Sequence, residues 1–169
     1  MNQEAIATKL KAAMRRMPGP VALITSTDPE TGARAGLAAS AVIPVSMDPP
    51  SMLVAVNRNA SAHATIVRAG RYCINLLCNS QADLVALFSD PARRGARFED
   101  ARWAETDGLP YLPGALVSIL CTIAHTQPFG THDLLIGTVD DVLPGTGSDP
   151  MGWIEGDFAR LMALGDLSG

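Results

Sequence analysis

The sequence predicts a mainly β fold, a closed or split antiparallel β-barrel with a few short peripheral helices. About six or seven segments rich in apolar and β-branched residues are separated mostly by short turns. Strands connected that closely have to pair antiparallel, because parallel neighbours need a long crossover. Regular alternation of strand and helix patterns is missing, as are the motifs GxGxxG and GxxxxGK[ST], which disfavours a Rossmann or P-loop domain.

Length and composition predict one domain covering residues 1–169. The chain has 47% hydrophobic and 18% charged residues, which is ordinary for a soluble globular protein. We expect an N-terminal helix over about 3–17, the barrel over about 20–145 and a C-terminal segment over about 150–164. The net charge of −4, with no basic run longer than Arg93-Arg94, argues against a nucleic-acid surface.

The expected localisation follows from the apolar runs, the first residues and the cysteines of the chain. Its apolar runs stay below the ~18 residues of a membrane span, and its first residues, with an early acid among the bases, do not resemble a signal peptide. The cysteines Cys73, Cys78 and Cys121 form no CxxC pair and indicate reduced thiols. We therefore expect a cytoplasmic protein that binds neither a membrane nor a metal ion.

Three helices are expected at the periphery. Residues 3–17 carry an apolar stripe at helical spacing, which predicts an amphipathic helix packing onto the core. Residues 58–70 predict a short helix capped by Asn59 or Ser61 and ended by Gly70. The third helix, residues 79–90, begins with the capping-box-like sequence SQAD. The apolar stripe of the first helix consists of Ile6, Leu10, Met14 and Met17.

The strand signals define the rest of the barrel. We expect strands at 21–27, 35–46, 51–57, 71–78, 115–127 and 132–143. Residues 44–56 read PVSMDPPSMLVAV, and the two adjacent prolines predict a corner between strands, since they lack backbone donors. The segment 90–114 is expected to be a long surface excursion, and 150–164 a turn with a short helix.

Five local patterns occur in order along the chain. They are GLAASAVIPVSMDPPSMLVAVN (36–57), the following Ser61 and Ile66, GRYCINLL (70–77) with the helix end ALFSD (86–90), GTHDLLIGTV (130–139), and DPMGWIEGDFARL (149–161). Together they resemble the flavin reductase-like family, which has the FMN-binding split-barrel fold. Its best-known members are the reductase components of two-component flavin-dependent monooxygenases. The resemblance covers nearly the whole chain.

The resemblance implies a set of flavin-binding residues. The strand entering the Pro-Pro corner should lie along the flavin and offer backbone amides, and the strand leaving it should hold the ribityl chain and phosphate. The helix after that strand would add its N–H groups to the anion site, although the residues alone also allow Asn59 and Ser61 to be simple caps. The matched positions are Gly36, Ala38, Ala39, Ser40, Ala41, Ala55, Val56, Asn57, Arg58, Ser61 and Phe88.

The resemblance also implies a nicotinamide site. His132 matches a histidine near the nicotinamide, and its expected role is to orient the nicotinamide amide or the flavin edge. Trp153, Glu155, Gly156 and Asp157 match a segment bordering that pocket. From the residues alone, His132 could equally be a surface group and Trp153 a core residue.

The implied function is an NAD(P)H-dependent flavin reductase that transfers hydride from NADH or NADPH to FMN or FAD. The reduced flavin would supply a partner monooxygenase, and the protein would be a homodimer with contacts through the N-terminal helix and residues 90–114. The alternative is a flavin-binding or electron-carrying protein of the same fold without efficient NAD(P)H use. That alternative is motivated by Ala38, Ala41 and Pro44, which stand where the family commonly has hydroxyl residues, and by Met151 and Gly152, which stand where it often has larger apolar and aromatic residues.

Overall fold

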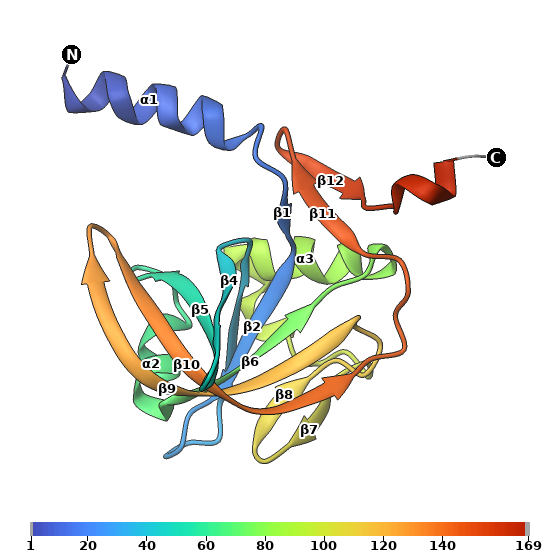
Figure 1. Ribbon diagram of the computed structural model, residues 1–169. Coiled ribbons are helices and arrows are strands. Elements are labelled where there is room, and N and C mark those ends of the chain that lie inside the picture. Colours follow the sequence, from blue (N-terminus) through green and yellow to red (C-terminus); the bar gives the residue numbers. More distant parts are fainter. Residues whose placement is uncertain (1, 168–169) are drawn as a thin grey trace.

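The computed structural model describes residues 2–167, and it consists mainly of antiparallel strands (Figure 1). Its elements are α1 Gln3–Met14, β1 Gly19–Pro20, β2 Ala22–Thr27, β3 Arg34–Ala39, β4 Val42–Met47, β5 Pro50–Asn57, α2 His63–Ala69, β6 Arg71–Leu76, η1 Asn79–Gln81, α3 Ala82–Ser89, η2 Pro91–Ala96, β7 Ala104–Thr106, β8 Leu109–Tyr111, β9 Val117–Phe129, β10 His132–Pro144, β11 Met151–Ile154, β12 Asp157–Arg160 and η3 Leu164–Leu167. The predicted mainly β, antiparallel fold is confirmed.

The main sheet has seven strands in the order β3-β2-β6-β9-β10-β5-β4. Its two edge strands, β3 and β4, are consecutive in the chain. The sequence predicted one strand over 35–46, and this was wrong. The chain turns at Ser40-Ala41, where the Val42 N–H donates to the Ser40 carbonyl at 3.0 Å. Residues before the turn pair with β2 and residues after it pair with β5, so the turn links the two edges of the barrel.

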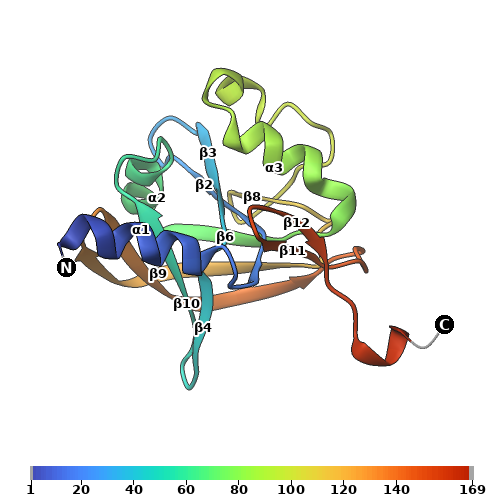
Figure 2. The ribbon, with the colours of Figure 1, turned by 90° about the horizontal axis from the view of Figure 1, so that it is seen from above.

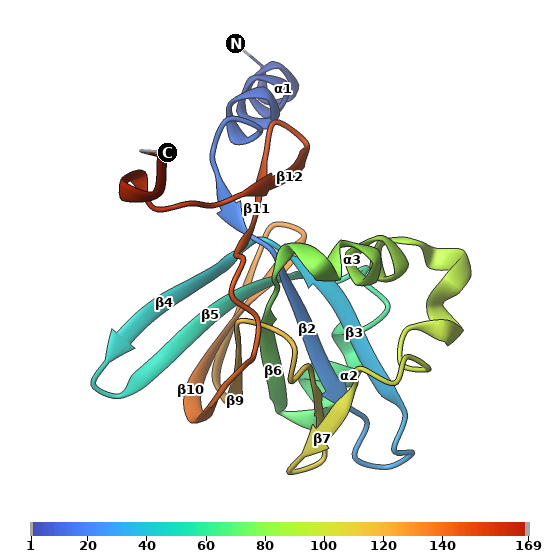
Figure 3. The same cartoon turned by 90° about the vertical axis from the view of Figure 1, so that its right-hand side faces the viewer.

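The Pro-Pro corner is the turn of the β4–β5 hairpin. Met47 pairs with Pro50, and the Asp48-Pro49 peptide bond is cis. Pro50 is the first residue of β5, a position that tolerates a missing backbone donor. The hairpin extends outward from the barrel (Figures 2 and 3). At its end Met47 is 79% exposed.

Strand β2 separates two clusters of the core. Ile24 belongs to the cluster inside the barrel, together with Val54 and Tyr72. Leu23 faces the other way and packs with Leu84 and other residues of α3. Because β2 is buried on both faces, it begins with the continuous apolar run Ala22 to Ile24, preceded by the buried Val21, rather than with an alternating pattern.

The N-terminal helix α1 does not pack onto the core, contrary to the prediction. None of its residues is buried, and Leu10 is 57% exposed. Figures 1 and 3 show the helix standing away from the barrel beside the small sheet β1-β11-β12. It is anchored at its end, where the Glu155 N–H donates to the Arg15 carbonyl at 2.5 Å.

The segment 90–114 lies largely at the surface, as predicted, but a few of its residues anchor it to the barrel. Arg97, Leu109 and Leu112 are buried, and the Phe98 and Trp103 rings pack on Phe88 with centroid distances of 5.4 and 5.8 Å. These apolar residues are irregularly spaced among charges, so the sequence shows no periodic signal.

The C-terminal segment also differs from the prediction. Residues 151–160 form the β11–β12 hairpin instead of a turn and short helix. The two residues of its turn, Glu155 and Gly156, have positive φ angles of 56° and 86°. Such angles at both positions are typical of the tight turn in a two-residue hairpin loop.

The helix caps are only partly as predicted. Gly70 ends α2 with φ of 65°, as expected. Helix α2 begins after Ala62 without a side-chain cap, so Asn59 and Ser61 do not cap it. The capping box before α3 joins Cys78 and Gln81 rather than Ser80 and Asp83. Within residues 2–167, no helix is long and apolar enough to cross a membrane.

Candidate active site

Three adjoining cavities follow β3 from Ser40 to Arg34. We call them the first, middle and terminal cavities, with volumes of about 180, 340 and 200 Å³. The first and middle cavities share Ala38 and Ser89. The middle and terminal cavities share Ser61, Arg94 and Arg97. Since a strand rises about 3.3 Å per residue, the three cavities form a groove roughly 20 Å long.

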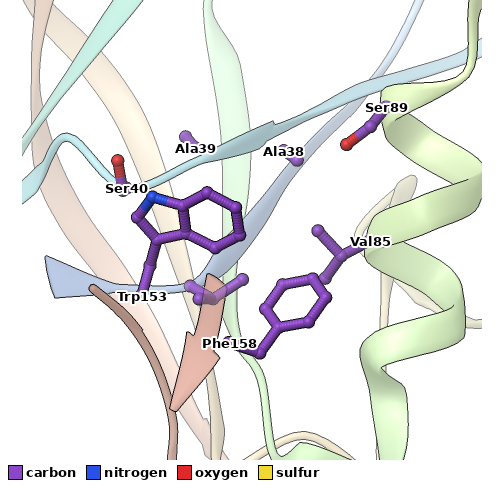
Figure 4. A pocket seen from close by; sticks show the side chains of 8 residues that line it. Ala38, Ala39, Ser40, Val85, Ser89, Trp153 and Phe158 are labelled. Carbon is purple, nitrogen blue, oxygen red and sulfur yellow. The ribbon is translucent and has the colours of Figure 1, made fainter. Parts of the chain in front are cut away.

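The first cavity is a slot between an aromatic pair and small side chains (Figure 4). Trp153 and Phe158 from the β11–β12 hairpin lie on one side, in edge-to-face contact with ring centroids 5.3 Å apart. Ala38 and Ala39 of β3 lie on the other side. Small side chains let a planar molecule approach the backbone closely, and the aromatic pair supplies an apolar wall.

The middle cavity contains a buried cation. Arg97 is only 6% exposed. Its Nη1 donates to the Gly36 carbonyl at 3.0 Å and its Nη2 to the Phe88 carbonyl at 2.6 Å. Its Nε is buried and has no hydrogen-bond partner among the described residues. Burial, and secondarily the nearby Arg94 charge, lower the pKa of Arg97.

An arginine remains charged in proteins even when its pKa is lowered. Two carbonyls accept from the Arg97 guanidinium, whose Cζ lies 5.3 Å from the Phe88 ring centroid, and Asp90 acts on it through charge, although no carboxylate within residues 2–167 forms an ion pair with it. Arg94 and Arg97 together give this end of the groove a positive charge. Sequence reasoning missed both Arg94 and Arg97, because RRGARF was assigned to a solvated excursion. The signal in the sequence for a cationic site was the clustering of arginines in RRGARF, with Arg97 directly before the aromatic Phe98.

The structure brings part of the expected site together in this groove. Ala38, Ala39, Ser40 and Trp153 line the first cavity. Ala38, Asn57, Ser61 and Phe88 line the middle cavity, and Gly36 and Ser61 the terminal one. The expected residues that line none of the three are Ala41, Ala55, Val56, Arg58, His132, Glu155, Gly156 and Asp157.

Arg58 is engaged away from the groove. Its guanidinium donates to the Gly130 carbonyl, and its Nη1 lies 3.4 Å from Oδ1 of Asp133. Val56 lies fully buried in the barrel core. The cation that borders the groove is thus supplied by residues 94 and 97, not by residue 58.

His132 lies next to the groove without lining it. It is the first residue of β10 and pairs with Asn57, which lines the middle cavity. Its Nδ1 lies 2.9 Å from the Thr131 hydroxyl. The hairpin tip at Glu155 to Asp157 instead contacts the end of α1, where Arg15 Nη2 donates to the Glu155 carbonyl at 2.5 Å.

A model of the flavin reductase like domain matches residues 14–162. The chain belongs to the flavin reductase-like family. This family member is 40% identical over 140 residues to the FMN reductase (NADH) RutF of Stutzerimonas stutzeri strain A1501, covering 82% of this chain and 79% of that protein. The corresponding protein of Agrobacterium fabrum strain C58 is 41% identical over 140 residues, with the same coverage of 82% and 79%.

Solved structures of the family share this fold. Flavin reductase PheA2 in its native state superposes with a TM-score of 0.80 at 28% identity, covering 96% of this chain and 100% of that one. The NADH:FAD oxidoreductase SgcE6 of Streptomyces globisporus, in complex with NAD and FAD fragments, has a TM-score of 0.84 at 21% identity, covering 96% of both chains. At that lower identity the likeness concerns the fold alone.

The groove fits a flavin nucleotide. The slot adjoins the middle cavity, which is bordered by hydroxyl and amide side chains and by Arg94 and Arg97. A flavin mononucleotide has the same order of parts: a flat ring, a hydroxylated chain and a phosphate. The residues that would hold these parts are Ala38 to Ser40 with Trp153, then Ser89 and Asn57, then Ser61, Arg94 and Arg97.

Proposed function

We propose that the protein is an NADH-dependent FMN reductase. The observation that carries the proposal is the run of adjoining cavities along β3, from the slot at Trp153 to the side chains of Arg94 and Arg97. Relatives about 40% identical are named FMN reductase (NADH). When bound, the flavin ring accepts hydride from the nicotinamide, so the chemistry needs no protein nucleophile.

The chain's own residues position the reactants. The β3 backbone at Ala38 and Ala39 supports one face of the slot, and Trp153 with Phe158 forms an apolar wall on the other side. Arg97 and Arg94 hold the phosphate, and this fixes the position of the ring along β3. For His132 we keep the role of orienting the nicotinamide amide or the flavin edge, because it pairs with Asn57 beside the middle cavity.

The proposal is tested by following NADH and NADPH oxidation by the purified protein with FMN, FAD or riboflavin added. We expect a flavin-dependent rate that is highest with NADH and FMN. No flavin-dependent rate with either nicotinamide would refute the proposal. A protein that binds FMN, and whose FMN is reduced by dithionite but not by NAD(P)H, would instead be the electron carrier of the alternative.

We also propose that the protein acts as a homodimer and passes reduced flavin to a flavin-dependent monooxygenase. Support for the dimer comes from the exposed apolar stripe of α1, which includes Ile6, Leu10 and Met14. The exposed residues of the segment 90–114 remain the second candidate for this contact. Support for flavin exchange comes from the open slot, where Trp153 and Phe158 are each 37% exposed.

The proposed compartment is the cytoplasm. All three cysteines are free and buried, which suits a reducing environment.

A further inference from the structure

The aromatic wall of the slot stands outside the seven-stranded sheet. Trp153 and Phe158 are paired across the β11–β12 hairpin, which belongs to the small sheet β1-β11-β12. The base of the hairpin is fixed to the barrel, because Met151 is buried and its N–H donates to the Leu77 carbonyl at 3.1 Å. The wall itself is held less firmly, since both rings are partly exposed and Phe158 lies on the edge strand β12.

The turn of this hairpin is held by the residue that follows α1. The Glu155 N–H donates to the Arg15 carbonyl, and Arg15 Nη2 donates to the Glu155 carbonyl, both at 2.5 Å. The guanidinium also lies against Gly156, where an added Cβ would be 2.5 Å from Nη2. The turn and the end of α1 lie side by side in Figure 1. Arg15 is therefore bonded to the turn through both its backbone and its side chain.

The place of the turn explains why this contact bears on the slot. Trp153 lies two residues before Glu155, and Phe158 lies two residues after Gly156. A displacement of the two-residue turn would therefore move both rings. The neighbouring Arg16 contributes little, because its Nε lies 3.8 Å from Glu155 Oε1 and its side chain is 82% exposed. Ion pairs between exposed side chains are worth little.

We propose that Arg15 is a positioning residue for the ring-binding slot. By holding the turn, it keeps Trp153 and Phe158 opposite β3 before a flavin ring enters (Figure 4). This rests on the proposed function, which places the ring in the first cavity. Without the side-chain contact, the wall is in place in only a fraction of the free molecules, and the observed affinity falls by that fraction. The complex that does form is unchanged, so kcat is retained.

The first test titrates riboflavin and FMN by quenching of flavin fluorescence. Arg15→Met should weaken both flavins by the same factor, about threefold to tenfold, because the contact acts at the ring and not at the phosphate. In steady-state NADH oxidation the KM for FMN should rise by that factor, while kcat stays within about twofold. Arg15→Lys keeps a donor for the Glu155 carbonyl and should restore most of the affinity. Arg16→Met is the matched control, since it removes the same charge one residue away, and it should change neither affinity.

The second test follows the wall directly. The chain has two tryptophans, so in a Trp103→Phe background the emission comes from Trp153 alone. Time-resolved fluorescence anisotropy of the flavin-free protein should show larger nanosecond motion of Trp153 after Arg15→Met, and no change after Arg16→Met.

Three results would overturn the role of Arg15. They are unchanged motion of Trp153 in Arg15→Met, a loss of FMN affinity with riboflavin affinity retained, and equal losses in Arg15→Met and Arg16→Met. Each leaves the proposed function standing, provided that the wild type oxidises NADH in the presence of FMN. A wild type that neither binds riboflavin or FMN nor shows FMN-dependent NADH oxidation would refute the proposed function, and the positioning role with it.

Discussion

Nε2 of His63 lies 2.7 Å from Oδ2 of Asp133, and Oδ1 of the same carboxylate faces the Arg58 guanidinium at 3.4 Å. Asp133 is buried on β10, while His63 begins α2 and Arg58 follows β5. This carboxylate therefore ties both ends of the loop 58–62 to the central sheet. Ser61, which borders the phosphate end of the groove, belongs to that loop.

Asp133→Asn should loosen this loop. The carboxamide keeps the shape of the side chain but removes the charge that Arg58 and His63 face. Because Arg58 is partly exposed, we expect a loss of only about 1–2 kcal/mol in unfolding free energy. The KM for FMN should rise while kcat is retained. Urea denaturation and steady-state kinetics measure both effects, and Asp141→Asn on the exposed part of β10 is the control. An unchanged KM would mean that the loop does not position Ser61.

Arg97→Met should remove the preference for phosphorylated flavin. The variant loses the charge proposed to meet the phosphate, so FMN affinity should fall about tenfold to a hundredfold while riboflavin affinity changes little. Quenching of flavin fluorescence measures both affinities. Arg97→Lys keeps the charge and should retain part of the preference. Equal losses for FMN and riboflavin would show that Arg97 only supports the fold.

Gly36→Ala should destabilise the wall of the groove. A Cβ at this position would lie 2.7 Å from Cε1 of Phe88 and 2.9 Å from the Ile24 carbonyl oxygen. Overpacking of this kind costs about 1–3 kcal/mol. Thermal unfolding should show a lower Tm than the wild type, whereas Gly95→Ala, with nothing within 4 Å of its added Cβ, should not. Equal Tm values for both variants would contradict this.

Leu10→Glu should separate the proposed dimer. It places a charge in the middle of the exposed apolar stripe of α1, where a second copy would bury it. Light scattering coupled to size exclusion should report a monomer. Ala12→Glu introduces the same residue about 200° around the helix and should leave the dimer intact. A dimer that survives Leu10→Glu would exclude α1 as the contact.

Much of the barrel could be predicted from the sequence because its signals are local. The strand pattern, the Pro-Pro turn and the left-handed Gly70 each depend on a few neighbouring residues. The slot residues Ala38 to Ser40 and Trp153 were found through their resemblance to a family rather than through their chemistry.

The other features depend on contacts between distant parts of the chain. Arg58 precedes Ser61 closely enough to suggest a shared phosphate site, but its direction is set by Gly130 and Asp133, more than seventy residues away. The burial of Arg97 was missed for a similar reason, because its guanidinium donates to carbonyls of β3 and α3 that are distant in the sequence or lie in another element. For α1, the apolar stripe predicts that one face of the helix can be buried. It does not show whether that face packs on the core of its own chain or on another molecule.

The strand order also bears on how the protein folds. Strands β2–β3, β4–β5 and β9–β10 are sequence-local hairpins, and pairs of this kind form in about 1–10 μs. The pairs β6–β9 and β5–β10 join residues far apart in the chain, so their formation carries a larger loop-closure entropy and should limit the rate. The groove draws on β3, α2, α3 and η2 at once, and so exists only after that late step. A bound flavin nucleotide should therefore lengthen the lifetime of the native state without accelerating its formation.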